Sequence, residues 1–325
     1  MVVSGVTQAI PEQITTSMAH IVHEVHSAGA FLAQTAALRQ ADPIATNHMA
    51  SIATAVLSGA RPAAGIRFFV VAATAPDNDD TLPTSLALWN VPRRSIYLSP
   101  TVSTADAIAL GHHLGSSSPA HGIECSGARD AVEAFGRTFC NHQEVETTLQ
   151  WKEDLVLYVL ATLRIPTTVA GRMRVATCGD LTFLTEWTQL YNVSIRAPLA
   201  DAHAFVVRTF STQSLFVWEN DAGSPVAYGS LAPTVQLDGG VMVFRIGSIF
   251  VPENERRKGY ASAITAALSA FVLAKDETMT AKVVCLYASA GNPASNKAYQ
   301  NVGFVKHSET STFACVHAAP MDQGS

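Results

Sequence analysis

The chain has 325 residues, which is long enough for two domains that each bury a core. Hydrophobic residues make up 48% of it and charged residues only 14%, a balance that excludes an intrinsically disordered protein. The net charge of −5 argues against a nucleic-acid partner. The sequence has neither the ~18-residue apolar run of a membrane helix nor the opening pattern of a signal peptide. Five scattered cysteines without a Cys-x-x-Cys pair indicate reduced thiols, so we expect a cytoplasmic protein with no membrane partner.

Residues 1–150 alternate helix-patterned and strand-patterned segments and are expected to form a first domain. The patterns predict helices at 14–38, 47–57, 105–114 and 128–139, strands at 68–72, 86–90 and 95–100, and a turn that contains Asp79 and Asp80.

Two groups of histidines in this half raise the question of a metal site. They are His20, His23 and His26, and then His112, His113 and His121 with Cys125. Zinc sites usually take His at i and i+4 or paired Cys, and neither group fits such a template. We therefore expect no metal.

Residues 151–170 are expected to form a connecting helix and a linker. Leu155, Tyr158 and Val159 recur at near-helical spacing, and Pro166 then favours the end of a helix. A second domain would begin at residue 171.

The second domain, 171–325, has a regular predicted order of elements. The patterns predict a strand at 172–177, a helix at 179–191, a hairpin of strands at 215–218 and 226–231, a strand at 241–251, a helix at 261–275, a strand at 282–287, a helix from Pro293 and a strand from Phe304.

The turn before the predicted helix at 261–275 has the composition of an anion site. A helix N-terminus leaves about four N–H groups without internal partners, and these groups bind anions. Gly259 lets the backbone approach a phosphate, and small Ala261 permits close packing. Arg256, Arg257 and Lys258 add positive charge. This pattern predicts a pyrophosphate cradle, although a solvated basic turn would have the same residue types.

A second signal lies about forty residues later. Asn292 follows a turn, Pro293 suits the first turn of a helix, and Gly303 ends that helix before Phe304. Tyr299 lies seven residues after Asn292, two helical turns on, so both residues lie on nearly the same helix face.

Together, Arg256-x-x-Gly259-x-Ala261 and Asn292-x-x-Ser295-x-x-x-Tyr299-x-x-x-Gly303-Phe304 resemble the signatures of the Gcn5-related N-acetyltransferases (GNAT). The resemblance implies an α+β fold for 171–325, with a mixed, mostly antiparallel sheet flanked by helices. The first half resembles a degenerate copy, as in two-domain members and glycine N-acyltransferase-like proteins. That half has no phosphate turn and would wall the acceptor site.

The resemblance implies acetyl-coenzyme A as co-substrate and no metal. Tyr299 would protonate the leaving thiolate, and free backbone groups near Ile249 would pair with the coenzyme arm. The implied coenzyme-binding residues are Ile249, Phe250, Val251, Arg256, Arg257, Lys258, Gly259, Tyr260, Ala261, Ser262, Asn292 and Asn296. The general base stays open, with Glu219, Asp238 and Glu253 as candidates.

The function that this resemblance implies is transfer of an acetyl group to a primary amine of a small molecule, by direct attack on the thioester. A protein lysine or N-terminal acetyltransferase is an alternative, and so is a non-catalytic acyl-coenzyme A-binding protein. A nucleotide-binding P-loop is disfavoured because no Gly-x-x-x-x-Gly-Lys-Ser/Thr segment is present. Because the chain holds two halves of similar pattern, either a monomer or a homodimer is compatible with it.

Overall fold

The computed structural model describes residues 19–74, 82–116, 122–143, 146–195, 199, 201–275 and 280–317. The strands of the first half are β1 (Ala19–Val25), β2 (Ile66–Thr74), β3 (Leu82–Asn90), β4 (Ser95–Leu98), β5 (Glu124–Gly127) and β6 (Thr147–Leu160). Its α-helices are α1 (Ala28–Gln34), α2 (Ala36–Ala41), α3 (Asn47–Leu57), α4 (Thr104–Gly115) and α5 (Arg129–Asn141).

The second half repeats this alternation of strands and helices. Its strands are β7 (Arg172–Val175), β8 (Leu215–Glu219), β9 (Pro225–Leu231), β10 (Val235–Gln236), β11 (Val241–Phe250), β12 (Ala281–Ser289) and β13 (Phe304–His317). Its α-helices are α6 (Leu181–Ser194), α7 (Asp201–Ser211), α8 (Tyr260–Leu273) and α9 (Pro293–Val302).

The two halves share one order of elements, which confirms the predicted repeat of a single fold. In each half a strand and a group of helices precede three strands, a helix, a strand, a helix and a long final strand, and the second half adds the two-residue strand β10. Each half also contains one parallel pair, β4 with β5 and β11 with β12, among antiparallel neighbours. The α+β class with a mixed, mostly antiparallel sheet flanked by helices is therefore confirmed.

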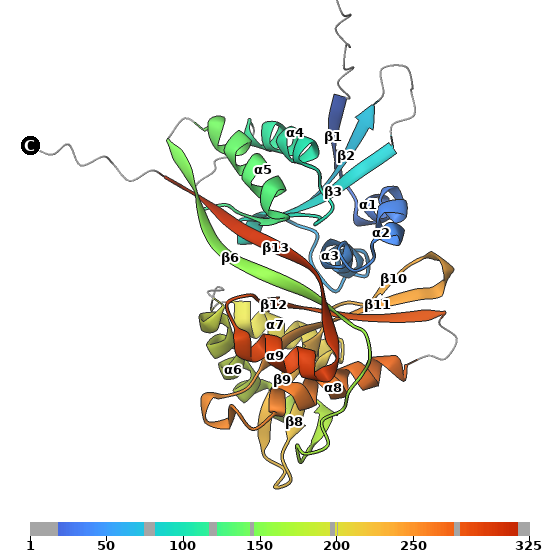
Figure 1. Cartoon of the computed structure of the whole chain (residues 1–325), viewed down its shortest axis with the longest axis vertical. Coiled ribbons are helices and arrows are strands. Elements are labelled where there is room, and N and C mark those ends of the chain that lie inside the picture. The colour runs from blue at the N-terminus through green and yellow to red at the C-terminus, as the bar shows by residue number, and fades with distance from the viewer. Residues whose placement is uncertain are drawn as a thin grey trace, which may run out of the picture.

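The halves join through their last strands, which they exchange. The sheet order is β1-β2-β3-β4-β5-β13-β6-β12-β11-β9-β8-β7, with β10 paired to β11. The first-half strand β6 thus pairs with β12, and the second-half strand β13 pairs with β5. These two long strands also pair with each other, from Phe304↔Leu160 to His317↔Thr147, and cross the middle of the molecule (Figure 1). One continuous sheet results, in which each half completes the other.

The prediction of a connecting helix at 151–170 is wrong. Residues 147–160 form β6, and residues 161–170 follow as the linker. The segment Leu155 to Leu160 is a continuous apolar run, which a strand buried on both faces also shows. Pairing with β12 on one edge and β13 on the other decides the conformation. Helical spacing in so short a run was not diagnostic.

The predicted helix at 14–38 is wrong over residues 19–25, which form β1 and pair with β2. From residue 28 onward the chain is helical as predicted, but in two short helices, α1 and α2. Ile21, Val22 and Val25 are β-branched and favour a strand. Residues 14–18, together with Asp79, Asp80 and His121, lie outside the described residues. The other predicted helices and strands are confirmed, with ends shifted by a few residues.

Helices cover both faces of the second half. On one face, which we call the α8 face, α8 and α9 pack on buried Phe216, Ile246 and Leu286. On the other, the α6 face, α6 and α7 pack on Val217 and Tyr228. The first-half helix α3 reaches the α6 face as well, because its Ala50 belongs to the same buried cluster as Val243 and Cys285. The first half therefore covers part of the second half's sheet.

The linker 161–170 folds back on the end of α9, and this contact supplies a test of the fold. Gly303 has a left-handed φ of 105°, and a Cβ there would overlap the carbonyl oxygen of Thr162. We expect Gly303→Ala to lower the free energy of unfolding by about 2–4 kcal/mol, measured by urea titration. Gly223→Ala is the matched control, because its φ is 76° but a Cβ meets nothing within 4 Å. An equal loss in both variants would contradict the predicted overlap with the linker.

The ion pair between Arg174 of β7 and Asp180 makes the free energy of unfolding depend on pH. Asp180 receives hydrogen bonds from Arg174 at 2.6 and 2.9 Å and from the Thr177 N–H at 2.7 Å. The Arg174 guanidinium is the largest cause that lowers the pKa of Asp180, from 3.8 to about 2. A carboxyl group whose pKa is lower in the folded than in the unfolded state stabilises the fold at pH values above its unfolded pKa. That stabilisation is lost as the pH falls through the folded pKa.

We therefore expect the wild type to lose about 2–3 kcal/mol more stability than Asp180→Asn between pH 5 and pH 2. Urea unfolding at both pH values measures the difference between the two proteins. A constant difference across this range would contradict the assigned pKa shift.

Candidate functional site

Strands β11 and β12 separate partway along the sheet. Their parallel pairing runs from Val241↔Ala281 to Ile246↔Leu286 and then stops. Beyond that point β11 pairs only with β9, after a bulge between Ile246 and Ile249, while β12 pairs only with β6. We call residues 247–250 of β11 and 287–289 of β12 the strand fork. Backbone groups that face the fork have no strand partner among the described residues.

Hydroxyl groups gather at the bulge on the α6 face. The Ser248 N–H donates to Ser230 Oγ at 3.1 Å, which holds the bulge. The Ser248 side chain lies close enough to Tyr191 of α6 and Tyr228 of β9 to affect the pKa of both phenols. Burial is the main cause that raises the pKa of both tyrosines, so both phenols stay protonated at neutral pH.

Tyr299 approaches the fork from the α8 face. It is 8% exposed, and its ring lies 6.4 Å from the rings of Tyr158 and Phe304. Burial raises the pKa of Tyr299 above its usual range, and nearby Tyr191 raises it further. Tyr191 itself belongs to α6 and packs on the α6 face.

The turn before α8 has the backbone expected of an anion cradle. Gly259 is the N-cap of α8 with φ 87°, and no side chain caps the helix. Arg257 also has a left-handed φ of 65°. The N–H groups of Tyr260, Ala261 and Ser262 have no hydrogen-bond acceptor among the described residues, because the first helical bond is Ala263 N–H to Gly259 O at 3.0 Å.

The basic side chains of this turn are exposed and differ in their contacts. Arg256 Nε donates to the Val251 carbonyl at 3.2 Å, which fixes the turn to the end of β11. Lys258 Nζ lies 2.9 Å from Glu255. Arg257 has no ion pair or hydrogen bond with any described residue. Arg257 is therefore the cation of the turn that is free to meet an anion.

A hollow of about 280 Å³ adjoins this helix end. Its lining residues come from the linker, α8 and α9: Arg164, Ile165, Pro166, Thr168, Val169, Gly259, Ser262 and Asn301. Ser262 Oγ donates to Ala298 O at 3.3 Å, which joins α8 to α9 next to Tyr299. Arg164 is a cation that sequence reasoning missed, since only the path of the linker places it here.

The two asparagines of α9 already have protein partners. Asn292 Oδ1 accepts the Ser295 N–H at 3.1 Å and caps the helix. Asn296 Oδ1 accepts the Tyr158 hydroxyl at 2.9 Å, and its Nδ2 donates to Ser289 O and Asn292 O. These bonds fix α9 to β12 and β6. Coenzyme binding by the Asn296 side chain would have to replace one of them.

The predicted site residues thus fall into groups. The turn residues 256–262, the bulge after Ile246 and Tyr299 lie around the fork and the adjoining hollow. Phe250 is buried and points to the α6 side, where its ring lies 5.8 Å from Tyr228 and 6.1 Å from Trp187. Its side chain therefore packs in the core, and only its backbone can face a ligand.

The candidate bases named from sequence lie in different places: Glu253 is in the exposed turn between β11 and α8, Asp238 precedes β11, and Glu219 ends β8. Glu219 bonds Arg174 at 2.6 Å and also Arg172, which lowers its pKa. Glu153 of β6 instead lies close enough to Tyr191 to raise the pKa of that phenol. Strand alternation places it on the same side as Leu157, the α6 face. Sequence reasoning missed Glu153 because β6 was interpreted as a helix.

The corresponding helix of the first half has a different N-terminus. The Ser103 hydroxyl caps α4 by accepting the Asp106 N–H at 3.1 Å. The Asp106 carboxylate is 2% exposed and accepts hydrogen bonds from Ser85 at 2.5 Å and Thr84 at 3.2 Å, and it pairs with His20 at 2.7 Å. A buried negative charge at this helix end repels a phosphate.

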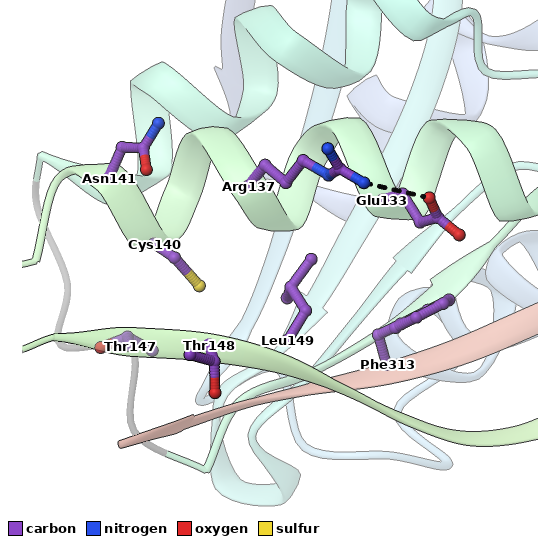
Figure 2. Close-up of a pocket in the computed structure, with 8 residues that line it drawn as sticks. All are labelled: Glu133, Arg137, Cys140, Asn141, Thr147, Thr148, Leu149 and Phe313. Atoms are coloured by element: carbon purple, nitrogen blue, oxygen red, sulfur yellow. Dashed lines mark ion pairs between the residues drawn. The ribbon is translucent and has the colours of Figure 1, made fainter. Parts of the chain in front are cut away.

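A second hollow, of about 430 Å³, lies between α5 and strands β6 and β13 (Figure 2). Glu133 and Arg137 lie 3.7 Å apart along its rim, and Cys140 points into it. It adjoins no helix N-terminus, since α5 contributes its middle and C-terminal turns. We assign it no role in the fork.

Within the described ranges, no group of three or more His, Cys, Asp or Glu could hold a metal ion. No described helix is both long and apolar enough to span a bilayer.

Comparisons with known proteins agree with this geometry. Residues 232–313 match the model of the FR47-like protein family, while no curated protein matches the chain. A solved GCN5-related N-acetyltransferase from Sphaerobacter thermophilus is 14% identical, with a TM-score of 0.56 over 92% of this chain and 96% of that one. A Drosophila protein is 11% identical, with a TM-score of 0.61 over 91% and 99%.

A tandem GNAT protein from the clavulanic acid biosynthesis pathway is 12% identical to this chain. Its TM-score is 0.50, with 94% of this chain and 100% of that one covered. At such identities the likeness concerns the fold. The predicted two-domain GNAT fold is confirmed over both halves.

Proposed function

From this two-domain GNAT fold and the geometry of the strand fork, we propose that the protein transfers an acetyl group from acetyl-coenzyme A to the primary amine of a small molecule. The carrying observation is that β11 and β12 separate after Ile246↔Leu286, and that Arg256 ties the uncapped N-terminus of α8 to the end of β11 beside this fork. A thioester held in the fork would be within reach of both faces. The alternatives are a protein acetyltransferase and a non-catalytic acyl-coenzyme A-binding protein.

The coenzyme would enter from the α8 face. The open N–H groups of Tyr260, Ala261 and Ser262 would bind its pyrophosphate, with Arg257 and Arg164 as flanking cations. Unpaired backbone groups of the fork would hold its arm. Acetyl-coenzyme A supplies the activated acetyl group. An anion fits at this helix end because no side chain caps α8. Residue 259 must also be a glycine, since a Cβ there would overlap the Val169 side chain.

The acceptor amine would approach from the α6 face. A neutral amine forms the C–N bond as the C–S bond breaks, and the thiolate takes a proton from the Tyr299 hydroxyl. Because burial raises the pKa of Tyr299, the phenol is protonated and can donate. Glu153 is the candidate base for the amine proton. The first-half helix α3 covers part of this face, where Arg245 donates hydrogen bonds to Asn47 at 3.1 Å and to Ser51 at 3.0 Å. Because this part of the face is covered, we favour a small acceptor over a protein.

The coenzyme site can be tested with a charge at the third residue of α8. Ser262→Asp places a carboxylate where helices favour one, which offsets part of the lost hydrogen bond to Ala298, so the fold should lose no more than about 1 kcal/mol of stability. The same charge repels a pyrophosphate, and we expect the Kd for acetyl-coenzyme A to rise about tenfold or more. Isothermal titration measures the Kd, and Ser262→Asn is the neutral control. Unchanged binding by the Asp variant would remove α8 from the coenzyme site.

The acid role of Tyr299 is tested by Tyr299→Phe. Loss of the proton donor should lower kcat by about 10- to 1000-fold, because general acid catalysis contributes terms of this size. The Kd for acetyl-coenzyme A should change little, since the ring is retained. Thiol release in the presence of a panel of primary amines measures turnover. A variant as fast as wild type would exclude Tyr299 as the acid.

A further inference from the structure

Three of the five cysteines lie together in the core that the first half builds with β13. Cys125 of β5, Cys140 of α5 and Cys315 of β13 belong to one buried cluster, although Cys315 follows Cys140 by 175 residues. The Sγ atoms of Cys140 and Cys315 lie 3.4 Å apart. The sulfurs of a disulfide are about 2.05 Å apart, so a movement of about 1.4 Å would join this pair.

The packing of α5 on the two crossing strands brings these thiols into contact. Leu149 of β6 is the strand partner of Cys315. A Cβ at Gly136 would overlap the Leu149 side chain, so the glycine lets α5 approach the strands this closely. Cys140 lies one helical turn after Gly136, on the same face of α5, and therefore meets the strand partner of Leu149.

Cys140 is the thiol of this pair that a small molecule can reach. Figure 2 shows its side chain directed into the hollow of about 430 Å³ between α5 and strands β6 and β13. Cys315 is only 1% exposed. The Cys315 thiol donates its hydrogen to Cys140 Sγ, which lowers the pKa of Cys140 and raises the pKa of Cys315. Because the thiolate is the form that attacks a disulfide, Cys140 is the nucleophile of the pair.

The lining of the hollow suits a small zwitterion. Glu133 and Arg137 lie 3.7 Å apart along its rim, and Asn141 and Thr148 add polar groups to its wall. An ion pair as exposed as this one contributes little to stability, so its two charges can turn to a ligand at little cost. Disulfides built from amino acids, such as glutathione disulfide, carry the matching carboxylate and ammonium groups.

We propose that Cys140 and Cys315 form a disulfide by exchange with a small amino-acid-derived disulfide bound in this hollow, and that the new bond fastens the exchanged strand β13 to α5. The Cys140 thiolate attacks one sulfur of the small disulfide and releases the other half, which takes a proton. The Cys315 thiol then loses its proton and attacks Cys140 Sγ, which releases the second half. Two protein thiols are oxidised by two electrons, and one small disulfide is reduced to two thiols. In a reducing compartment such a pair is a redox sensor rather than a permanent crosslink.

Peptide mapping of the folded protein without reductant tests the exchange. The probe is glutathione disulfide at millimolar concentration, and the starting protein carries Cys178→Ser, because exposed Cys178 would react by itself. We expect this protein to lose about 2 Da and to yield one peptide pair linked through Cys140 and Cys315. With Cys315→Ser added, the mixed disulfide should stay on Cys140 and add about 305 Da, and with Cys140→Ser added neither product should form.

Three results of this mapping would overturn the proposal, and each can be read in the protein that keeps both thiols. They are a folded protein whose Cys140 stays unmodified, a stable glutathione adduct on Cys140 beside intact Cys315, and a linked peptide that contains Cys125 in place of either partner. None of them depends on whether the protein transfers acetyl groups.

Thermal unfolding tests whether the bond fastens β13 to α5. A crosslink between residues 140 and 315 restricts the unfolded chain, so the oxidised protein should unfold at a Tm about 4 °C or more above that of the reduced protein. Dithiothreitol should reverse this shift. Cys125→Ser removes a buried thiol of the same cluster and should keep the shift, whereas Cys140→Ser should abolish it. A crosslinked protein with the Tm of the reduced form would contradict the fastening of β13.

Discussion

The site depends on one constraint, that β12 must leave β11 without losing its own backbone hydrogen bonds. A buried strand that gives up one neighbour has to keep another, because unpaired backbone groups are costly away from water. Strand β6 provides that neighbour, since it pairs with residues 285–289 of β12 over the length of the fork. On the other side, β9 holds β11 as far as Phe250. The exchange of β6 and β13 between the halves is thus what makes an open fork compatible with a continuous sheet (Figure 1).

The two halves show how one fold can keep or lose an anion site. In the second half, Gly259 begins α8 without a side-chain cap and leaves three N–H groups open. In the first, Ser103 caps α4, and buried Asp106 holds a negative charge at the same end. The topology is repeated, but the chemistry of the helix ends is opposite. The proposed coenzyme site therefore lies in the second half, and we propose that the first half shapes the acceptor side.

Local signals allowed part of this site to be predicted. Gly259 and Gly303 have left-handed φ values of 87° and 105°, conformations that a turn signal in the sequence can indicate. Glu153 was missed because the apolar run Leu155 to Leu160 fits a helix or a buried strand equally well, and only pairing with distant strands decides between them. Arg164 was missed as well, because only the folded path of the linker places it beside the start of α8. Whether a basic side chain has a partner depends on the tertiary structure.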